Sequence, residues 1–229
     1  MPNFDLARAS LRELNATLHA LASTTNETHW IVENPGGKHA IACGVDASVT
    51  IDIEGHVGYY CGGMNKRATI VVSGNAGVGV AENMMSGEVR VRGDASQAAG
   101  ATGCGGLLVI DGNASARCGI SMKGIDIVVK GSTGPMSAFM AQAGNLVVLG
   151  DAGDALGDSI YEARLFVRGQ VASLGADCVE KPMSTEDKVI LKTVLQRADI
   201  DQSVNADDFK MFGSARRLYH FHVDNVDAY

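Results

Sequence analysis

The sequence has few aromatic residues, few prolines and no excess of basic charge. Aromatic residues make up 5% of the 229 residues, and the formal net charge is −7 at pH 7. This balance argues against nucleic acid or an acidic membrane surface as the partner. No apolar run approaches the length of a membrane-spanning helix, and the first residues lack a charged-then-apolar signal start. We therefore expect a cytoplasmic protein.

The cysteine and histidine patterns of metal sites are also missing. The cysteines are odd in number and include no Cys-x-x-Cys pair: Cys43, Cys61, Cys104, Cys118 and Cys178. In a reducing cytosol we expect packed, reduced thiols. The histidines show no zinc-site spacing: His19, His29, His39, His56, His220 and His222. The sequence therefore predicts no metal site.

What the sequence does contain is glycine at a fixed interval. Seven anchor glycines stand nineteen residues apart, at Gly55, Gly74, Gly93, Gly112, Gly131, Gly150 and Gly169. Equal intervals of this kind indicate a repeat architecture. The positions two and four residues before each anchor are always Ile, Val or Leu. This alternation with one aliphatic face is typical of a β-strand, repeated once per interval.

Identical strands of this kind can stack as a parallel solenoid, with equivalent positions ~4.8 Å apart. Each aliphatic column is then buried by its copies above and below. Small or short polar residues follow the anchors, as tight corners require, and His56 fills one such polar slot. We predict an all-β solenoid, a right-handed parallel β-helix of about seven nineteen-residue turns over residues 45–178, with helical flanks.

The flanks are residues 1–44 and 179–229. In the first, leucines on one face predict a helix over 5–22 with Asp5 as its cap, followed by an irregular lead-in and cap segment from Trp30 to Ala47. In the second, a capping pattern at Ser184 predicts a helix that ends near Ala198. The aromatic tail beyond it, residues 209–222, is expected to pack on the coil or on another subunit.

One outward-facing position is unexpectedly apolar. Three residues before the anchors stand Val71, Val109, Val128, Val147 and Phe166, with Asp52 and Arg90 as interruptions. We call these apolar residues the outer stripe. An exposed stripe of this length is rare on a monomer. We therefore expect protein to cover it, either residues 180–229 or a partner.

Glycine-rich segments are the nearest candidates for a nucleotide site. Residues 74–79 and 100–106 neither open a βαβ helix nor precede a Gly-Lys-Ser/Thr sequence. Both are in phase with the repeat, so we interpret them as corners. We interpret Asp151, Asp154 and Asp158 as solvated turn carboxylates. The sequence thus predicts no catalytic, cofactor-binding or metal residue on this chain.

The repeat resembles a known family. The pattern Gly-x-x-Gly-x-x-x-Gly, at Gly55–Gly62 and Gly150–Gly157, resembles the carboxy-terminal β-helix (GXGXG) domain of glutamate synthase. The same type of domain occurs in a subunit of formylmethanofuran dehydrogenase. Residues 58–65, 81–87 and 157–162 resemble more closely the stand-alone β-helix subunit of N-methylglutamate synthase (methylamine–glutamate N-methyltransferase).

This resemblance implies a non-catalytic structural subunit of an enzyme complex that makes N-methylglutamate and ammonia from methylamine and glutamate. The implied partners are a glutamine-amidotransferase-like subunit and an FMN-binding glutamate-synthase-like subunit that also carries the iron–sulfur cluster. The family's catalytic residues lie on those chains, so none is transferred to this one. A stiff coil can hold two sites at a fixed separation and wall the passage between them.

Other interpretations stay open at this point. The chain could serve an ammonia-using glutamate-synthase-type amidotransferase in the same role. It could be an independent β-helix enzyme of the acyltransferase or carbonic-anhydrase type, although the histidine spacing of such enzymes is missing. A polysaccharide-binding module is disfavoured by the few aromatic residues on the coil.

Overall fold

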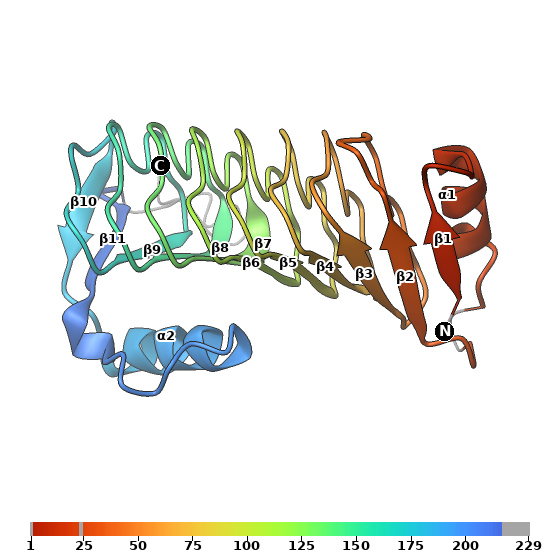
Figure 1. Ribbon diagram of the computed structural model, residues 1–229. Helices are drawn as coiled ribbons and strands as arrows, with labels where there is room; N and C mark the ends of the chain where they lie inside the picture. The colour runs from red at the N-terminus through yellow and green to blue at the C-terminus, as the bar shows by residue number, and fades with distance from the viewer. Residues whose placement is uncertain (1, 23–24, 217–229) are drawn as a thin grey trace, which may run out of the picture.

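A computed structural model of the protein describes residues 2–22 and 25–216. Its main element is one long sheet with the strand order β1-β2-β3-β4-β5-β6-β7-β8-β9-β11-β10 (Figure 1). The strands are β1 (Asn3–Asp5), β2 (His29–Glu33), β3 (Thr50–Glu54), β4 (Thr69–Val72), β5 (Glu88–Val91), β6 (Leu107–Ile110), β7 (Lys123–Val129), β8 (Ala143–Val148), β9 (Arg164–Val167), β10 (Cys178–Lys181) and β11 (Lys210–Ser214). The helices are α1 (Leu11–His19), α2 (Thr185–Arg197) and the short η1 (Ala206–Asp208). None of the helices in the described ranges is long and apolar enough to cross a membrane.

The pairing of the parallel strands follows the sequence repeat. From β3 to β9 each strand pairs with the next at a nineteen-residue offset, from Thr50 opposite Thr69 to Asn145 opposite Arg164. The predicted parallel β-solenoid of about seven turns is confirmed. Regular coiling starts earlier than expected, because β2 also pairs in parallel with β3, His29 opposite Thr50. The segment from Trp30, predicted to be irregular, therefore begins as a strand.

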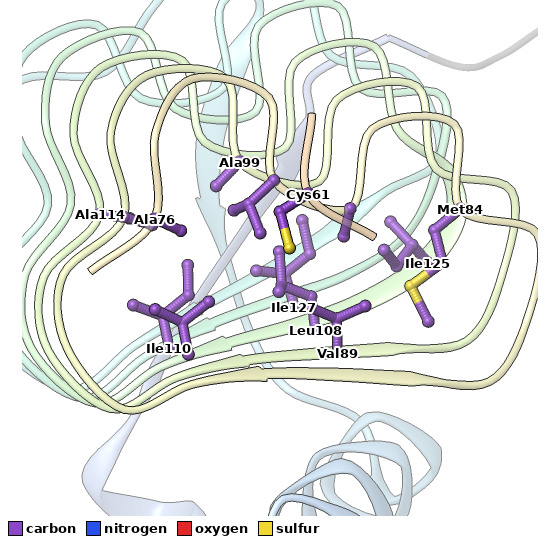
Figure 2. Close-up of a cluster of buried hydrophobic side chains, with 14 of the residues drawn as sticks. Cys61, Ala76, Met84, Val89, Ala99, Leu108, Ile110, Ala114, Ile125 and Ile127 are labelled. Atoms are coloured by element: carbon purple, nitrogen blue, oxygen red, sulfur yellow. The ribbon is translucent and has the colours of Figure 1, made fainter. Parts of the chain in front are cut away.

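The aliphatic columns fill the inside of the coil. The side chains four residues before the anchors are fully buried: Ile51, Ile70, Val89, Leu108, Ile127, Leu146 and Leu165. Figure 2 shows Val89, Leu108 and Ile127 pointing into the coil, where small side chains such as Ala99 and Ala114 face them from the corners. The narrow interior thus explains why Val, Ile, Leu and Ala replace aromatic residues in this core.

The corners are regular. Residues five, seven and nine positions after the anchors have left-handed backbone, as in Ala98 (φ 59°), Gly100 (φ 68°) and Thr102 (φ 54°). The N–H groups of Ala98 and Thr102 donate to Ala116 and Ile120 in the following coil, and that of Gly100 donates to the preceding coil. Because successive left-handed residues point their donors in opposite directions, each corner is bonded to both neighbours.

The anchor glycines serve a different purpose. A Cβ placed on Gly112 would lie 2.3 Å from the Asp94 Oδ1 atom and 2.8 Å from the Gly93 carbonyl oxygen of the preceding coil. No positive φ is needed there. From Gly74 onward, glycine is required at the anchors because the preceding coil approaches too closely for any side chain. Gly55 differs, because its φ is 140° and its nearest neighbour is the Pro35 side chain.

The N-terminal flank differs from the predicted helix over 5–22. The helix is shorter than predicted and consists of α1, Leu11–His19, with Ser10 as its N-cap. The Ser10 Oγ accepts from the Glu13 N–H, and the Glu13 carboxylate accepts from the Ser10 N–H. Asp5 instead ends β1, which adds a parallel strand beside β2. Leu14 and Leu18 are buried in the same core cluster as the coil, so α1 covers the end of the coil. The leucine spacing correctly indicated a helix, but the capping box Ser10-x-x-Glu13, which marks where the helix begins, was overlooked.

The C-terminal flank folds back along the coil. Ser184 caps α2 through a capping box with Asp187, and the helix ends next to Ala198, as predicted. β11 is antiparallel to both β9 and β10 and closes the sheet. Phe209 and Phe212 are buried. The remaining aromatic tail, including His220 and His222, lies outside the described residues.

Candidate functional site

The chain itself covers four of the five residues of the outer stripe, whereas Val71 is only half-buried. Val109, Val128, Val147 and Phe166 are fully buried in a second core together with Leu191, Val194, Leu195 and Ala198 of α2 and its end. Figure 1 shows α2 lying along the outside of the sheet below β7 and β9. The expectation that protein covers the stripe is confirmed, and of the two expected covers it is the chain's own flank.

Arg90, which interrupts the stripe, lies at the end of this cover. Its guanidinium donates to the Ala198 carbonyl oxygen at 3.2 Å and to the Asp199 carboxylate at 2.9 Å, and it also pairs with Glu88. The side chain is only 6% exposed. A cation at the C-terminal end of a helix interacts favourably with the free carbonyls there. Arg90 therefore fixes where α2 stops along the sheet.

The polar slot after each anchor forms a ladder on the surface. His56 Nδ1 accepts from the Asn75 N–H at 2.9 Å, Asn75 Oδ1 accepts from the Asp94 N–H at 2.9 Å, and Asp94 Oδ1 accepts from the Asn113 N–H at 2.7 Å. The ladder continues through Ser132 and Asp151 to Gln170. This geometry confirms the turn roles expected for His56 and Asp151.

The other turn carboxylates bond in the same manner. Asp154 accepts from the Ser173 hydroxyl at 3.0 Å, and Asp158 accepts from the Ser159 hydroxyl at 2.8 Å and from the Ala176 N–H at 3.2 Å. The contacts with Ser173 and Ala176 hold adjacent coils together. They support the interpretation as turn carboxylates instead of an acid–base pair.

The glycine-rich candidates are corners, as expected. A Cβ on Gly74 would lie 2.7 Å from the Gly55 carbonyl carbon, and one on Gly77 would lie 2.6 Å from the Gly58 carbonyl carbon. In the second segment, a Cβ on Gly100 would lie 2.5 Å from the Ile127 side chain. These missing side chains make room for the preceding coil or the core. The space is therefore already filled and is not a phosphate cradle.

His19, His29 and His39 each have a different partner. His29 Nε2 is 2.6 Å from Asp52 Oδ2, His19 Nε2 is 2.6 Å from the Cys43 carbonyl oxygen, and the His39 ring stacks on Tyr59. Within residues 2–22 and 25–216, no three His, Cys, Asp or Glu side chains are grouped so as to hold a metal ion.

The cysteines are free thiols in two environments. Cys61, Cys118 and Cys178 are buried, and burial raises the pKa of the Cys118 thiol to about 12 and that of Cys178 to about 11. Burial also raises the pKa of the Cys61 and Cys43 thiols. Cys104 is exposed, so the expectation of packed thiols was wrong there. The buried thiols are poor nucleophiles because they stay protonated.

The surface feature that the sequence reasoning missed is the turn face, the side of the coil formed by residues four to eleven positions after each of the first six anchors, Gly55 to Gly150. Of the nine exposed large hydrophobic side chains among the described residues, six lie on it: Tyr59, Tyr60, Met64, Met85, Met140 and Tyr161. The signal was present in the repeat, because several of these positions carry polar residues in other coils. The strand positions alone do not reveal this face, since it is built from corners.

A hollow of about 580 Å³ lies beside β11 at the end of the coil, lined by residues that include Tyr161, Arg164, Lys181 and Arg216. Two of its cations are already paired, Arg164 with Asp187 and Arg216 with Asp177. The hollow therefore offers less free positive charge than its lining suggests.

Comparison with known proteins adds one full-length relative. No protein-family model matches the chain. The chain is 61% identical over 229 residues to Protein GlxC of Rhizobium meliloti (strain 1021), and the alignment covers 100% of both proteins. At this identity over the whole length, the coil and both flanks correspond. The chain belongs to the same protein family as GlxC.

Proposed function

We propose that this chain is the non-catalytic β-helix subunit of a glutamate-synthase-like enzyme complex, of the N-methylglutamate synthase type. In this proposal it holds a glutamine-amidotransferase-like subunit and an FMN-binding subunit at a fixed separation. Methylamine and glutamate are converted to N-methylglutamate and ammonia on the partners. FMN and the iron–sulfur cluster belong to the flavin subunit.

The observation that carries the proposal is the uninterrupted coil. Seven steps from β2 to β9 extend about 34 Å at the usual strand spacing. The corners as well as the strands are hydrogen-bonded to both neighbouring coils. A rod of this length with bonded corners is suited to keeping two bound proteins apart at a constant distance.

The side chains in the interior support the same role. The core columns consist of aliphatic side chains that contact one another across the coil, as Figure 2 shows for Leu108, Ile127 and Ile125. The polar side chains directly after the anchors are engaged in bonds between coils. These features support a contact surface as the functional part of the chain, and the motif resemblance supports the kind of complex.

The test is reconstitution from separately purified chains. The isolated chain is expected to be colourless and to show no turnover with methylamine or ammonia. Mixed with the amidotransferase-like and flavin-binding subunits, it is expected to co-elute with both. Supplying methylamine or ammonia to the complex then separates the N-methylglutamate synthase type from the ammonia-using type. Flavin binding or turnover by the isolated chain would contradict the proposal.

A further inference from the structure

We propose that four side chains on the turn face, Tyr59, Tyr60, Met64 and Met85, dock one of the enzyme partners of this chain. We call them the Tyr/Met patch. The proposal rests on the proposed function, since it assigns a surface to one of those partners. The partner surface that fits the patch is apolar with a rim of carboxylates.

The patch is concentrated on two adjacent coils. Tyr59, Tyr60 and Met64 follow Gly55 by four, five and nine residues, and Met85 lies in the next coil. The Met85 N–H donates to the carbonyl oxygen of Asn65 at 2.8 Å. Since Asn65 directly follows Met64, Met85 belongs to the same part of the surface. The four side chains are 49%, 47%, 53% and 52% exposed.

The fold does not require apolar residues at these positions. The repeat supplies its own comparison, because polar side chains occupy several of the same positions in other coils. The position of Tyr59 is occupied by Gln97 and Asp154 in other coils, and that of Tyr60 by Arg117. The position of Met64 is occupied by Asn83 and Ser121, and that of Met85 by Lys66 and Lys123. The apolar choice in the patch therefore serves something other than coil formation.

The backbone makes that choice costly. Tyr60 has φ 60° and Met64 has φ 54°. In the next coil the equivalent residues are Gly79 and Asn83, which adopt left-handed backbone more readily. A bulky residue in this conformation is strained. The coil tolerates the same strain at Arg117 and Met136, so the patch residues need a reason other than the backbone.

The two rings are held in place before any partner binds. The His39 ring stacks on Tyr59 with the centroids 4.5 Å apart and an interplanar angle of 19°. The Tyr60 ring lies over Gly79, where a Cβ would come within 2.9 Å of it. Fixed aromatic rings beside flexible methionines combine low ordering cost with adaptable packing, and both residue types are enriched at protein interfaces.

The area and the charge of the Tyr/Met patch indicate what kind of partner binds there. Four half-exposed side chains of about 200 Å² each present roughly 400 Å², half of one side of a standard interface. Lys38, Lys66 and Arg67 stand near the patch in the sequence together with the carboxylates of Asp46 and Glu82, which leaves one positive charge on a chain of net charge −7. Lys66 and Arg67 both pair with Asp46. A partner with a carboxylate rim complements this surface. A second copy related by two-fold symmetry would bring these cations together.

The test uses the double variant Tyr60→Asn/Met64→Asn, since asparagine tolerates left-handed backbone and should preserve the coil. The matched control is Arg117→Asn/Met140→Asn, at the same two positions of later coils. Binding of the amidotransferase-like and the flavin-binding subunit is measured separately by calorimetry, with melting temperatures as the folding check. The patch variant is expected to bind one subunit at least 10-fold more weakly, while the control stays within twofold of wild type.

A second readout uses the wild-type chain alone. In hydroxyl-radical footprinting, Met64 and Met85 are expected to be protected in the complex while Met140 labels unchanged. Equal binding by the patch variant and unchanged labelling of Met64 and Met85 would overturn the docking surface and leave the proposed function standing. If wild type binds neither subunit, both proposals fall. Self-association of the wild-type chain that the patch variant abolishes would assign the patch to a second copy and overturn it as well.

Discussion

At the residue scale, glycine serves this fold in two separate ways. The anchors, such as Gly112, are positions where the preceding coil leaves no space for a Cβ. The corner glycines, such as Gly100, have left-handed backbone, and alanine replaces them in the equivalent positions Ala81 and Ala138. The sequence distinguishes the two classes, because the anchors are invariant across the repeats whereas the corner position varies.

Replacing an anchor should therefore cost more than the usual glycine substitution. Gly112→Ala is expected to destabilise the protein by about 3 kcal/mol, because the new Cβ overlaps the Gly93 carbonyl and Asp94. Gly213→Ala is the matched control, since its Cβ would meet nothing closer than 3.5 Å. Chemical denaturation of both variants measures the difference. Similar losses in the two variants would contradict the close-approach explanation.

Thiol reactivity should separate the cysteines by burial. At pH 8 under native conditions, iodoacetamide is expected to modify Cys104 first, because it is exposed. Cys118 should react only after unfolding, since burial raises its pKa to about 12 and blocks access. Peptide mass spectrometry over time gives the order. Labelling of Cys118 at the rate of Cys104 in the folded protein would show that the core is open.

At the scale of elements, α2 is the piece that turns an open sheet face into a second core. Its inner residues pack on β6 to β9, and Arg90 holds its C-terminal end. The helix itself was predictable from its capping box and the stripe from its apolar column. The contact between the helix and the stripe was not predictable, because either a partner or the flank could cover the stripe. Only the tertiary structure decides between these two covers.

Removing the largest side chain of the stripe should loosen this cover. Phe166→Ala is expected to cost about 3–5 kcal/mol, because Phe166 is fully buried between the sheet and the C-terminal flank. Val71→Ala is the control, from the same column on a strand where the side chain is only half-buried. Limited proteolysis should cut the flank of the first variant faster. Equal resistance of the two variants to the protease would show that Phe166 does not hold α2 on the sheet.

The cap of α2 should also make stability depend on pH. Burial opposes ionisation of Asp187, but hydrogen bonds from Ser184 and Arg164 outweigh it and lower the pKa below 3.8. A lowered pKa means that the stabilisation is present above the unfolded value and is lost as the pH falls through the folded one. Asp187→Asn is therefore expected to cost about 1 kcal/mol at pH 7 and progressively less below pH 3.8.

Denaturant unfolding at pH 7 and pH 3 measures this effect. Glu186→Gln is the control, because the neighbouring Glu186 is exposed and makes no side-chain hydrogen bond within the described part of the chain. A loss for Asp187→Asn that stays the same at both pH values would show that the carboxylate's charge does not contribute.

Other elements show where sequence reasoning stops. The nineteen-residue period predicted β3 to β9 with their registers, because each strand repeats the same local pattern. β2 was missed because its step to β3 is twenty-one residues, which falls outside the period. The turn face was missed for another reason. Which corner residues point outward depends on the alternating left-handed backbone, and no local pattern shows that before the coil is built.

At the scale of the whole molecule, the coil is a rod with a covered sheet face on one side and an exposed turn face on the other (Figure 1). The cover uses the chain's own C-terminal flank, so the sheet face along α2 is not available to a partner. The turn face keeps its methionines and tyrosines exposed. This asymmetry agrees with a protein whose work is done by contact with other chains.

We propose that this chain couples two partner activities without performing chemistry itself. The most direct measurement is N-methylglutamate formation by the amidotransferase-like and flavin-binding subunits, with and without this chain, in the presence of methylamine and glutamate. The account predicts product only when all three chains are present and none from this chain alone. Full product formation by the two partners without this chain, or turnover by this chain alone, would contradict it.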